Sequence, residues 1–291
     1  MKLHSRYDPY VFLVLPVTVY VFVVSLPIVF SVYYSFMDWT GMTRPVFIGF
    51  DNFKRMLSDN VLLASIVNNL KYTAINTVYQ VGFGLVMAIV IQRLVFGQNL
   101  VRVLLFSPVI ISTMAISQTF RRLLALNPDG VVNALLVAVG LEEMRAAFLA
   151  DIGITLYVVS MVEAYKYSGL YLVIFYTAFK AIDRNVIEAA TIDGTGGWQM
   201  YFHIKLPIIR PVIISSLVLV VMGTLKSFDI PFILTNGGPG NASELMATYM
   251  YKVAFNRLDY GYGSAISILI IVISILAVGI ITFLAKPKEA A

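Results

Sequence analysis

The chain has 291 residues, of which 59% are hydrophobic and 13% are charged, and its mean hydropathy is +0.84. This composition excludes a soluble globular domain, because such domains carry about 25% charged residues. Cysteine is absent, which excludes a disulfide framework, a thiolate metal site and a cysteine nucleophile. The net charge of +5 comes from basic residues that are scattered singly, so we do not expect nucleic-acid binding.

Six apolar stretches are long enough to cross a membrane. A bilayer core of about 30 Å requires roughly 20 predominantly apolar residues in a helix, which satisfies its own backbone hydrogen bonds. The sequence therefore predicts an all-α integral membrane protein with one transmembrane domain over residues 1–291. The predicted spans are approximately Tyr10 to Phe36, Tyr72 to Ile91, Val103 to Phe120, Ile152 to Phe179, Ile208 to Phe228 and Gly263 to Ala285.

The first stretch is predicted to be a span, because it is too long for the apolar core of a signal peptide and no A-x-A-like cleavage site follows it. Pro16 and Pro27 lie inside this stretch, and Pro108 lies inside the third. Neighbouring helices can satisfy the carbonyl that a proline frees. We expect a kink at each proline in preference to a gating hinge.

Six spans place both termini on one side of the membrane. The loops on that side are shorter and carry few acids, whereas the basic residues of the other side are balanced by acids. Basic residues of the terminal side are Lys2, Arg6, Arg93, Arg102, Lys180, Arg184, Lys205, Arg210, Lys286 and Lys288. Because short cytoplasmic loops carry an excess of Lys and Arg, we expect both termini in the cytoplasm.

Two apolar segments of the outer loops, Val131 to Leu141 and Tyr249 to Phe255, are too short to span. We expect them to form short helices at the outer interface or under the bundle.

The loop between the fourth and fifth predicted spans, Lys180 to Pro211, is polar but patterned. Apolar residues first recur on one helical face, three glycines follow, and a second apolar pattern begins at Trp198. The pattern predicts two short helices joined by a glycine bend, with Pro207 and Pro211 marking the start of the fifth span. The glycines are Gly194, Gly196 and Gly197.

Several side chains of this loop are apolar although the loop lies outside the membrane. They are Val186, Ile187, Trp198, Tyr201 and Phe202. An exposed apolar surface of this kind favours docking of a protein partner. Folding of the loop onto its own helix ends remains an alternative.

The segment contains Glu188-Ala189-Ala190, Asp193-Gly194 and Ile204-x-Leu206-Pro207, and this spacing closely resembles the EAA loop of ABC-transporter permease subunits. The flanking segments are similar to carbohydrate-uptake permeases of the maltose and glycerol-phosphate type, in particular to the maltose system's larger permease without its large outer domain. These segments are Leu234–Gly240, Asn127–Gly130 and Asn133–Leu136. The resemblance covers essentially the whole chain. It departs at Thr195-Gly196-Gly197, where relatives more often place Ala and polar residues, which puts the stiffness of the bend in doubt.

The resemblance implies a type I ABC importer permease in a bacterial cell membrane, with a cytoplasmic coupling loop seated in a cleft of an ATPase subunit. Glu188 would pair with a basic residue there, and Gly194 would allow the bend. The residues implied in ATPase coupling are Arg184, Glu188, Ala189, Ala190, Asp193, Gly194, Ile204, Leu206 and Pro207. The implied partners are a second related permease, an ATPase dimer that binds ATP and Mg, an extracellular or periplasmic solute-binding protein and a carbohydrate. Consistent with a separate ATPase, the chain has no G-x-x-x-x-G-K-[ST] loop, and we expect it to bind no cofactor itself.

Four ionisable residues lie at predicted membrane depth, where charge is costly and often functional. Glu163 and Lys166 are three residues apart, as are Lys226 and Asp229, so each pair is placed to form a same-face ion pair. Purely structural pairing, or interfacial placement of the second pair, stands as an equal alternative to substrate contact.

Aromatic and amide side chains add to these candidates. Tyr165, Tyr167, Tyr171 and Phe228 lie beside the charged residues, and aromatic rings commonly hold sugars. Asn76 and Gln80 share one helical face, where bonding between helices is favoured over bonding to a sugar hydroxyl. The candidate substrate-pathway residues are Glu163, Lys166, Tyr167, Lys226, Phe228, Asp229, Asn76 and Gln80.

Two other classes of protein fit the sequence less well. In a self-sufficient secondary transporter or channel, the patterned loop Lys180 to Pro211 would have no function. An intramembrane enzyme needs a catalytic constellation, yet the chain has no G-x-S-x-G or H-E-x-x-H motif, and both histidines, His4 and His203, lie outside the predicted spans. We therefore predict a noncatalytic permease subunit with no metal site, which forms half of a carbohydrate pathway; the sequence does not identify the solute.

Overall fold

The computed structural model describes residues 8–285, which are mostly helical. The basic residues Lys2, Arg6, Lys286 and Lys288, on which the topology prediction partly rests, lie outside these described residues, as does His4. Contacts divide the chain into two compact units, Met1–Asn60 with Met250–Val272 and Val61–Tyr249 with Ile273–Ala291.

In the part of the chain that the structure describes, four helices are long and apolar enough to cross a membrane. They are Phe12–Tyr34, Asn60–Arg93, Thr155–Lys180 and Tyr260–Ala285, and they correspond to the first, second, fourth and sixth predicted spans. The second begins at Asn60 instead of Tyr72, because its polar first part is also helical and buries side chains such as Asn69. Hydropathy alone placed that start too late.

Two further helix pairs reach the same length only if each bent pair counts as one span. Gln98–Ile110 and Thr113–Leu123 meet at 96°, and Gly197–Ile208 meets Arg210–Leu225 at 69°. The described residues thus contain four such helices, or up to six with the bent pairs. The third predicted span, Val103 to Phe120, is therefore not one continuous helix: the chain becomes extended at Ile111 and Ser112, and this break replaces the kink expected at Pro108.

Several long helices are composites that contain a π-helical turn. The first consists of α1 (Asp8–Tyr20), η1 (Val21–Ser25) and α2 (Leu26–Tyr34), and it stays continuous through both of its prolines. The second consists of α4 (Asn60–Thr77), η2 (Val78–Phe83) and α5 (Gly84–Arg93). A π-helical turn often marks a functional position.

The remaining elements are mostly short. They are β1 (Met37–Asp38), β2 (Val46–Phe47), α3 (Asp51–Met56), α6 (Gln98–Ile110), α7 (Thr113–Leu123), α8 (Val131–Ala138), η3 (Glu142–Met144), α9 (Thr155–Lys180), α10 (Arg184–Ile192), α11 (Gly197–Gln199), η4 (Met200–Lys205), α12 (Leu206–Ile208), α13 (Arg210–Leu225), α14 (Asp229–Thr235), α15 (Met246–Tyr251), η5 (Lys252–Asn256) and α16 (Tyr260–Ala285). Helices α8 and α15 with η5 confirm that the two short outer-loop segments are helical.

The first unit is held by aromatic stacking and one ion pair. The strands β1 and β2 pair antiparallel, and Trp39 after β1 stacks on Tyr34 with ring centroids 4.2 Å apart. The backbone oxygen of Trp39 accepts the N–H groups of Tyr260 and Gly261, and Arg55 of α3 forms an ion pair with Asp259 at 2.7 Å. These contacts fix the hairpin to the start of α16.

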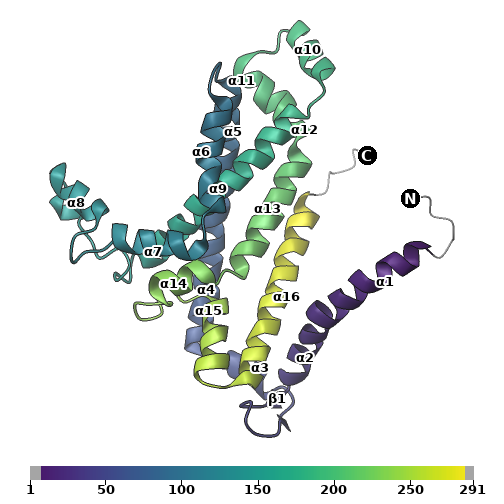
Figure 1. Cartoon of the computed structure of the whole chain (residues 1–291), viewed down its shortest axis with the longest axis vertical. Helices are drawn as coiled ribbons and strands as arrows, with labels where there is room; N and C mark the ends of the chain where they lie inside the picture. Colours follow the sequence, from purple (N-terminus) through teal and green to yellow (C-terminus); the bar gives the residue numbers. More distant parts are fainter. Residues whose placement is uncertain (1–7, 286–291) are drawn as a thin grey trace. The chain divides into compact units, whose positions relative to one another are not determined.

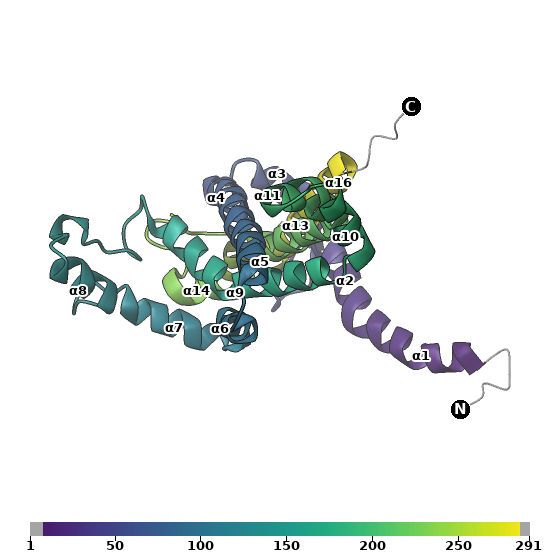
Figure 2. The same ribbon diagram turned by 90° about the horizontal axis from the view of Figure 1, so that it is seen from above.

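The second unit is built around α9. Figure 1 and the view from above in Figure 2 both show α5 and α6 next to α9, and in Figure 1 α10 and α11 lie beyond their ends. The core between them contains the fully buried Ala88, Leu172 and Phe175. The helices approach closely at two glycines: a Cβ on Gly84 would lie 2.8 Å from the Cβ of Tyr171, and a Cβ on Gly169 would collide with the backbone of Leu105.

The α6–α9 contact leads to a prediction for stability. Gly169→Ala places a methyl group against the carbonyl of Leu105, and overpacking of this kind costs about 1–3 kcal/mol. We expect a lower unfolding temperature in detergent, measured by tryptophan fluorescence or scanning calorimetry. Gly82→Ala is the matched control, because nothing lies within 4 Å of its added Cβ. Equal unfolding temperatures for the two variants would contradict the close approach.

Candidate functional site

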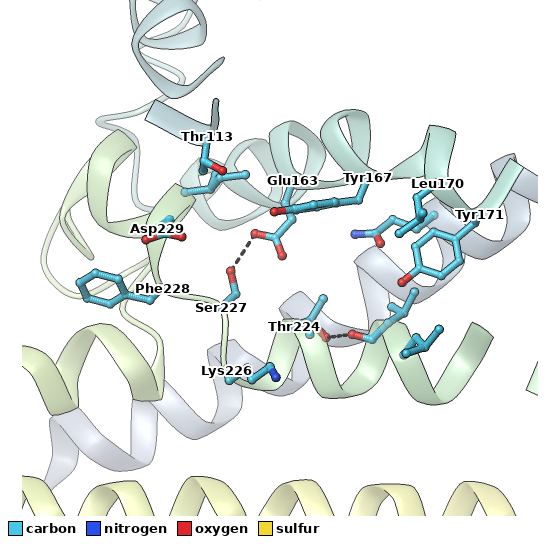
Figure 3. Close-up of a pocket in the computed structure, with 15 residues that line it drawn as sticks. Thr113, Glu163, Tyr167, Leu170, Tyr171, Thr224, Lys226, Ser227, Phe228 and Asp229 are labelled. Carbon is cyan, nitrogen blue, oxygen red and sulfur yellow. Dashed lines mark hydrogen bonds between the residues drawn. The ribbon is translucent and has the colours of Figure 1, made fainter. Parts of the chain in front are cut away.

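A cavity of about 470 Å³ lies in the second unit between α9, α13 and the turn that precedes α14. Six of the eight candidate pathway residues line it, and Figure 3 shows several of them around the open space. They are Gln80, Glu163, Tyr167, Lys226, Phe228 and Asp229. The structure thus brings together candidate side chains from three separate segments of the chain, although their contact with a substrate stays a prediction.

Glu163 is the most deeply placed charge of this cavity, with 6% of its surface exposed. Its Oε2 atom accepts hydrogen bonds from the hydroxyl of Tyr72 at 2.5 Å and from Ser227 at 2.7 Å. In Figure 3 the second carboxylate oxygen of Glu163 points away from Ser227, into the space that the labelled side chains surround. A buried carboxylate oriented by two donors can accept further hydrogen bonds from a ligand's hydroxyl groups.

The wall of the cavity opposite Glu163 is formed by the turn between α13 and α14. Helix α13 ends at Leu225 and α14 begins at Asp229, so Lys226 and Asp229 do not lie on one continuous helix. Within the described chain these two residues form no ion pair, contrary to the expectation. The three-residue spacing predicts a same-face pair only where the helix is unbroken. Both side chains are exposed.

Phe228 and Tyr167 supply aromatic surface to the cavity. Phe228 stacks on Phe232 with ring centroids 4.8 Å apart, and Tyr167 lies above Glu163 in Figure 3. Tyr171 also lines the cavity. Tyr165 instead packs on Phe120 with centroids 5.3 Å apart and is exposed, so only three of the four aromatic candidates reach the cavity.

Lys166 lies elsewhere. Its side chain is buried and its Nζ donates to backbone carbonyls at the end of α6, at 2.5 Å to Ile111 and 3.4 Å to Pro108 and Val109. The expected ion pair with Glu163 is not formed in the described structure. Carbonyls at the end of a helix lack intrahelical partners, and Lys166 satisfies those that the 96° break leaves open. A contact between Lys166 and substrate stays a prediction.

Asn76 and Gln80 bond to each other and to their own helix. The amide of Gln80 donates to Asn76 at 2.9 Å, and Asn76 donates to the backbone of Tyr72 at 3.0 Å. Gln80 lines the cavity from η2, whereas Asn76 is buried beneath it. The bonding between helices that we favoured for this pair is therefore not among the contacts of the described residues. Two turns before Asn76, Asn69 does bond between helices, to the backbone of Thr224 on α13.

Four polar residues of this region are not among the candidates that the sequence indicates. They are Tyr72, Ser227, Thr113 and Thr224. Tyr72 was placed at the start of a span, where aromatic residues are common, and the three hydroxyl residues carry no motif. Their proximity to Glu163 and its cavity depends on the breaks after α6 and α13, which no sequence spacing indicated. Within the described residues no group of acidic or histidine side chains could hold a metal ion.

The loop from α10 to η4 has the predicted form of two short helices joined at glycines. Asp183 caps α10 by accepting from the N–H of Asn185 at 2.9 Å. After α10, Gly194 has φ +80° and Gly197 has φ +57°, a left-handed conformation that glycine adopts without strain. On α10, Arg184 pairs with Glu188 at 2.6 Å, and both side chains are exposed.

Part of this loop folds onto the helix ends and part remains exposed. Tyr201 is buried, packs edge-on against Phe179 with centroids 5.9 Å apart, and lies 5.2 Å below the guanidinium of Arg93. Trp198 is 56% exposed although Arg93 lies 4.1 Å above its ring. Folding onto the helix ends therefore applies to Tyr201, whereas Trp198 keeps the exposed apolar surface that docking of a partner requires. The other exposed apolar side chains are Val186, Ile192 and Phe202.

Similarity to known proteins assigns the family. A family model described as "binding-protein-dependent transport system inner membrane component" matches residues 80–287. The chain belongs to this family. It is therefore a multi-pass inner-membrane component, and the prediction of an ABC-transporter permease is confirmed.

Individual relatives cover nearly the whole chain. It is similar to the probable ABC transporter permease YurN of Bacillus subtilis, with 34% identity over 93% of both chains. It is also similar to the osmoprotective-compound uptake permease GgtC of Synechocystis, at 30% over 90% of this chain and 94% of that protein. The multiple sugar-binding transport system permease MsmF of Streptococcus mutans is 27% identical over 95% of each.

The fold matches that of a solved ABC importer. A chain of the bacterial transporter that imports the acidic polysaccharide alginate aligns with a TM-score of 0.85 and 21% identity, over 97% of this chain and 96% of that one. A second structure of an alginate transporter, in complex with its pentasaccharide-bound periplasmic protein, aligns with a TM-score of 0.84 and 20% identity over 98% and 96% of the chains. These likenesses confirm the type I importer permease fold.

The position of Lys166 leads to a prediction. Lys166→Met removes the donor to the carbonyls at the α6 break, and unpaired buried acceptors cost about 1–3 kcal/mol. We expect a lower unfolding temperature for this variant in nanodiscs, with partial recovery in Lys166→Arg. Lys71→Met, at an exposed lysine of α4, is the control. Wild-type stability of Lys166→Met would show that the carbonyls do not depend on this lysine.

Proposed function

We propose that this chain is the noncatalytic permease subunit of a binding-protein-dependent ABC importer and forms half of the pathway for a carbohydrate. The names of its relatives support the substrate class: they include a multiple sugar-binding system and a system for starch degradation products. The observation that carries the proposal for this chain is the cavity between α9 and the α13–α14 break. It combines aromatic rings, an oriented carboxylate and an amide.

The cavity has the chemistry to bind a polyhydroxylated ligand. Ligand pockets commonly have volumes of about 300–1,000 Å³, and this one has about 470 Å³. Tyr167 and Phe228 would contact the apolar faces of sugar rings, while Glu163, Asp229 and Gln80 would accept or donate hydrogen bonds to hydroxyls. Lys226 adds a donor to the same wall.

ATP hydrolysis would take place in partner chains. We propose that α10 and the glycine bend after it dock onto an ATPase dimer that binds ATP and Mg, with Glu188 and Gly194 in the roles that the EAA resemblance implies. A second related permease would complete the pathway and a solute-binding protein would deliver the carbohydrate. Both termini and the loop would then face the cytoplasm, and the chain would act as one transmembrane domain without a cofactor of its own.

The coupling role gives the first test of this proposal. Glu188→Ala removes an exposed carboxylate whose pair with Arg184 adds little to stability. Gly194→Asp forces a side chain into a left-handed conformation. In the complex purified on this chain, we expect Glu188→Ala to reduce the ATPase stimulation by loaded binding protein about tenfold, since a lost charged hydrogen bond is worth about 1.5–3 kcal/mol. We expect Gly194→Asp to reduce the same stimulation because strain in the bend displaces α10.

Matched controls separate coupling from folding. Gly140→Asp introduces the same backbone strain at φ +78° after α8, and Glu142→Ala removes an exposed carboxylate of η3. Both controls should keep full stimulation. Recovery of the chain under gentle conditions without any ATPase, or wild-type coupling in both loop variants, would reject the proposal and favour a self-sufficient transporter.

The cavity gives a second test. Tyr167→Leu removes a ring that lines the cavity, whereas Tyr165→Leu removes an exposed ring of the same helix that faces Phe120. Aromatic contacts contribute about 0.5–1.5 kcal/mol, so we expect a reduction of about fivefold in the rate of sugar uptake by proteoliposomes for the first variant only. An equal loss in both variants would remove the cavity from the pathway.

A further inference from the structure

A second cavity lies at the opposite end of α9 from Glu163. It has a volume of about 390 Å³ and lies where α5 and α9 end, α6 begins, and α10 and η4 cover them. Its apolar part comes from Phe179, Ile182 and Ile187. Its polar lining residues are Gln92, Gln98, Lys180, Arg184, Glu188 and Lys205.

Positive charge exceeds negative charge in this cavity. Lys180, Arg184 and Lys205 are its lining cations, and Glu188 is its one lining carboxylate. Glu188 is already paired with Arg184 at 2.6 Å. Within the described residues neither lysine forms an ion pair. The lining therefore carries two cations that no carboxylate balances.

Lys205 is held in place although it lacks a counter-ion. It is half-buried, and its Nζ donates to Oε1 of Gln92 at 3.3 Å and lies 4.5 Å from the ring centre of Tyr201. The hydroxyl of Tyr201 donates to the same Gln92 oxygen at 3.3 Å. A half-buried ammonium group with only neutral partners keeps donor capacity for an anion.

Lys180 is placed by a similar contact on the α6 side. Its Nζ lies 5.7 Å from the ring centre of Tyr176, whose hydroxyl donates to Gln98 at 2.9 Å. Arg102 of α6 lies 5.1 Å above the same ring. Lys180 and Lys205 thus line the cavity from α9 and η4, and Arg102 of α6 lies over the ring that Lys180 also contacts. None of these contacts uses a carboxylate.

The surroundings of the cavity are those of a membrane surface. Gln98 begins α6, which continues with apolar side chains that are about 60% exposed, namely Leu100, Val103 and Leu104. Just before α6, Val95 and Phe96 are more than 80% exposed. An apolar helix face that leads up to a basic pocket offers acyl chains a surface and a headgroup a site.

We propose that this cavity binds the phosphate of an anionic phospholipid, with Lys180 and Lys205 as its main contacts. The acyl chains would lie along the exposed face of α6, and Gln92 and Gln98 would donate to headgroup oxygens. The lipid would thereby join α6 and α9 to η4 and α10. This site is separate from the sugar cavity and does not depend on the importer function.

Native mass spectrometry of the complex purified on this chain tests the site. Phosphatidylglycerol and phosphatidylcholine of identical acyl chains are titrated into the detergent-solubilised complex, and bound lipid is counted. We expect tighter binding of phosphatidylglycerol. A basic residue near anionic lipid contributes about 1 kcal/mol, so Lys180→Gln and Lys205→Gln should each reduce this preference about fivefold, and the double variant should lose it.

The controls identify the source of the phosphate. Lys71→Gln removes an exposed lysine of α4, and the phosphatidylglycerol preference should remain unchanged. An excess of inorganic phosphate should not displace the lipid, because the acyl chains add contact area. Equal binding of the two lipids to wild type, an unchanged preference in the double variant, or full displacement by inorganic phosphate would each overturn the proposal. A normal unfolding temperature of the double variant confirms that it is folded.

Discussion

The close approach of α5 and α6 to α9 is the contact on which the second unit depends. Lipid provides no hydrophobic drive that pushes one apolar helix against another, so helices in a membrane associate through small residues that let backbones come near. Gly84 of α5 allows that helix to approach Tyr171 of α9, and Gly169 of α9 allows that helix to approach Leu105 of α6. With both neighbours fixed against it, α9 can present Glu163 and Tyr167 to one cavity and Phe179 to the other.

Broken helices supply the polar walls of the larger cavity. A chain in a membrane must satisfy each backbone group where a helix ends, and side chains from α9 and α4 do so here. Lys166 bonds the carbonyls at the end of α6, and Asn69 bonds the backbone of Thr224 near the end of α13. The breaks then leave Thr113 and Ser227 beside Glu163, so the same irregular backbone that requires capping also brings hydroxyl groups to the site.

The elements that could be predicted from sequence are those governed by local pattern. Apolar length found the helices of the first, fourth and sixth spans, and three glycines indicated the bend between α10 and α11. The start of the second helix was missed because polar residues such as Asn69 are buried against other helices. The expected ion pairs Glu163–Lys166 and Lys226–Asp229 were wrong. Spacing along a helix does not show that Lys166 bonds the end of another helix, nor that the helix itself ends between Leu225 and Asp229.

The two cavities are joined by two uninterrupted helices. Along α9, Glu163 and Phe179 are separated by about 24 Å at 1.5 Å per residue, and the helix Asn60–Arg93 carries Gln80 at one cavity and Gln92 at the other. Because closely packed interiors transmit displacement instead of absorbing it, a force on α10 or η4 would move these two helices together through their contact at Gly84. The π-helical turn η2 lies beside that glycine. A shift of α10 or η4 would therefore move α9 and the helix Asn60–Arg93 together. Glu163 and Gln80 would then change their distance from the opposite wall of the cavity, at the α13–α14 break.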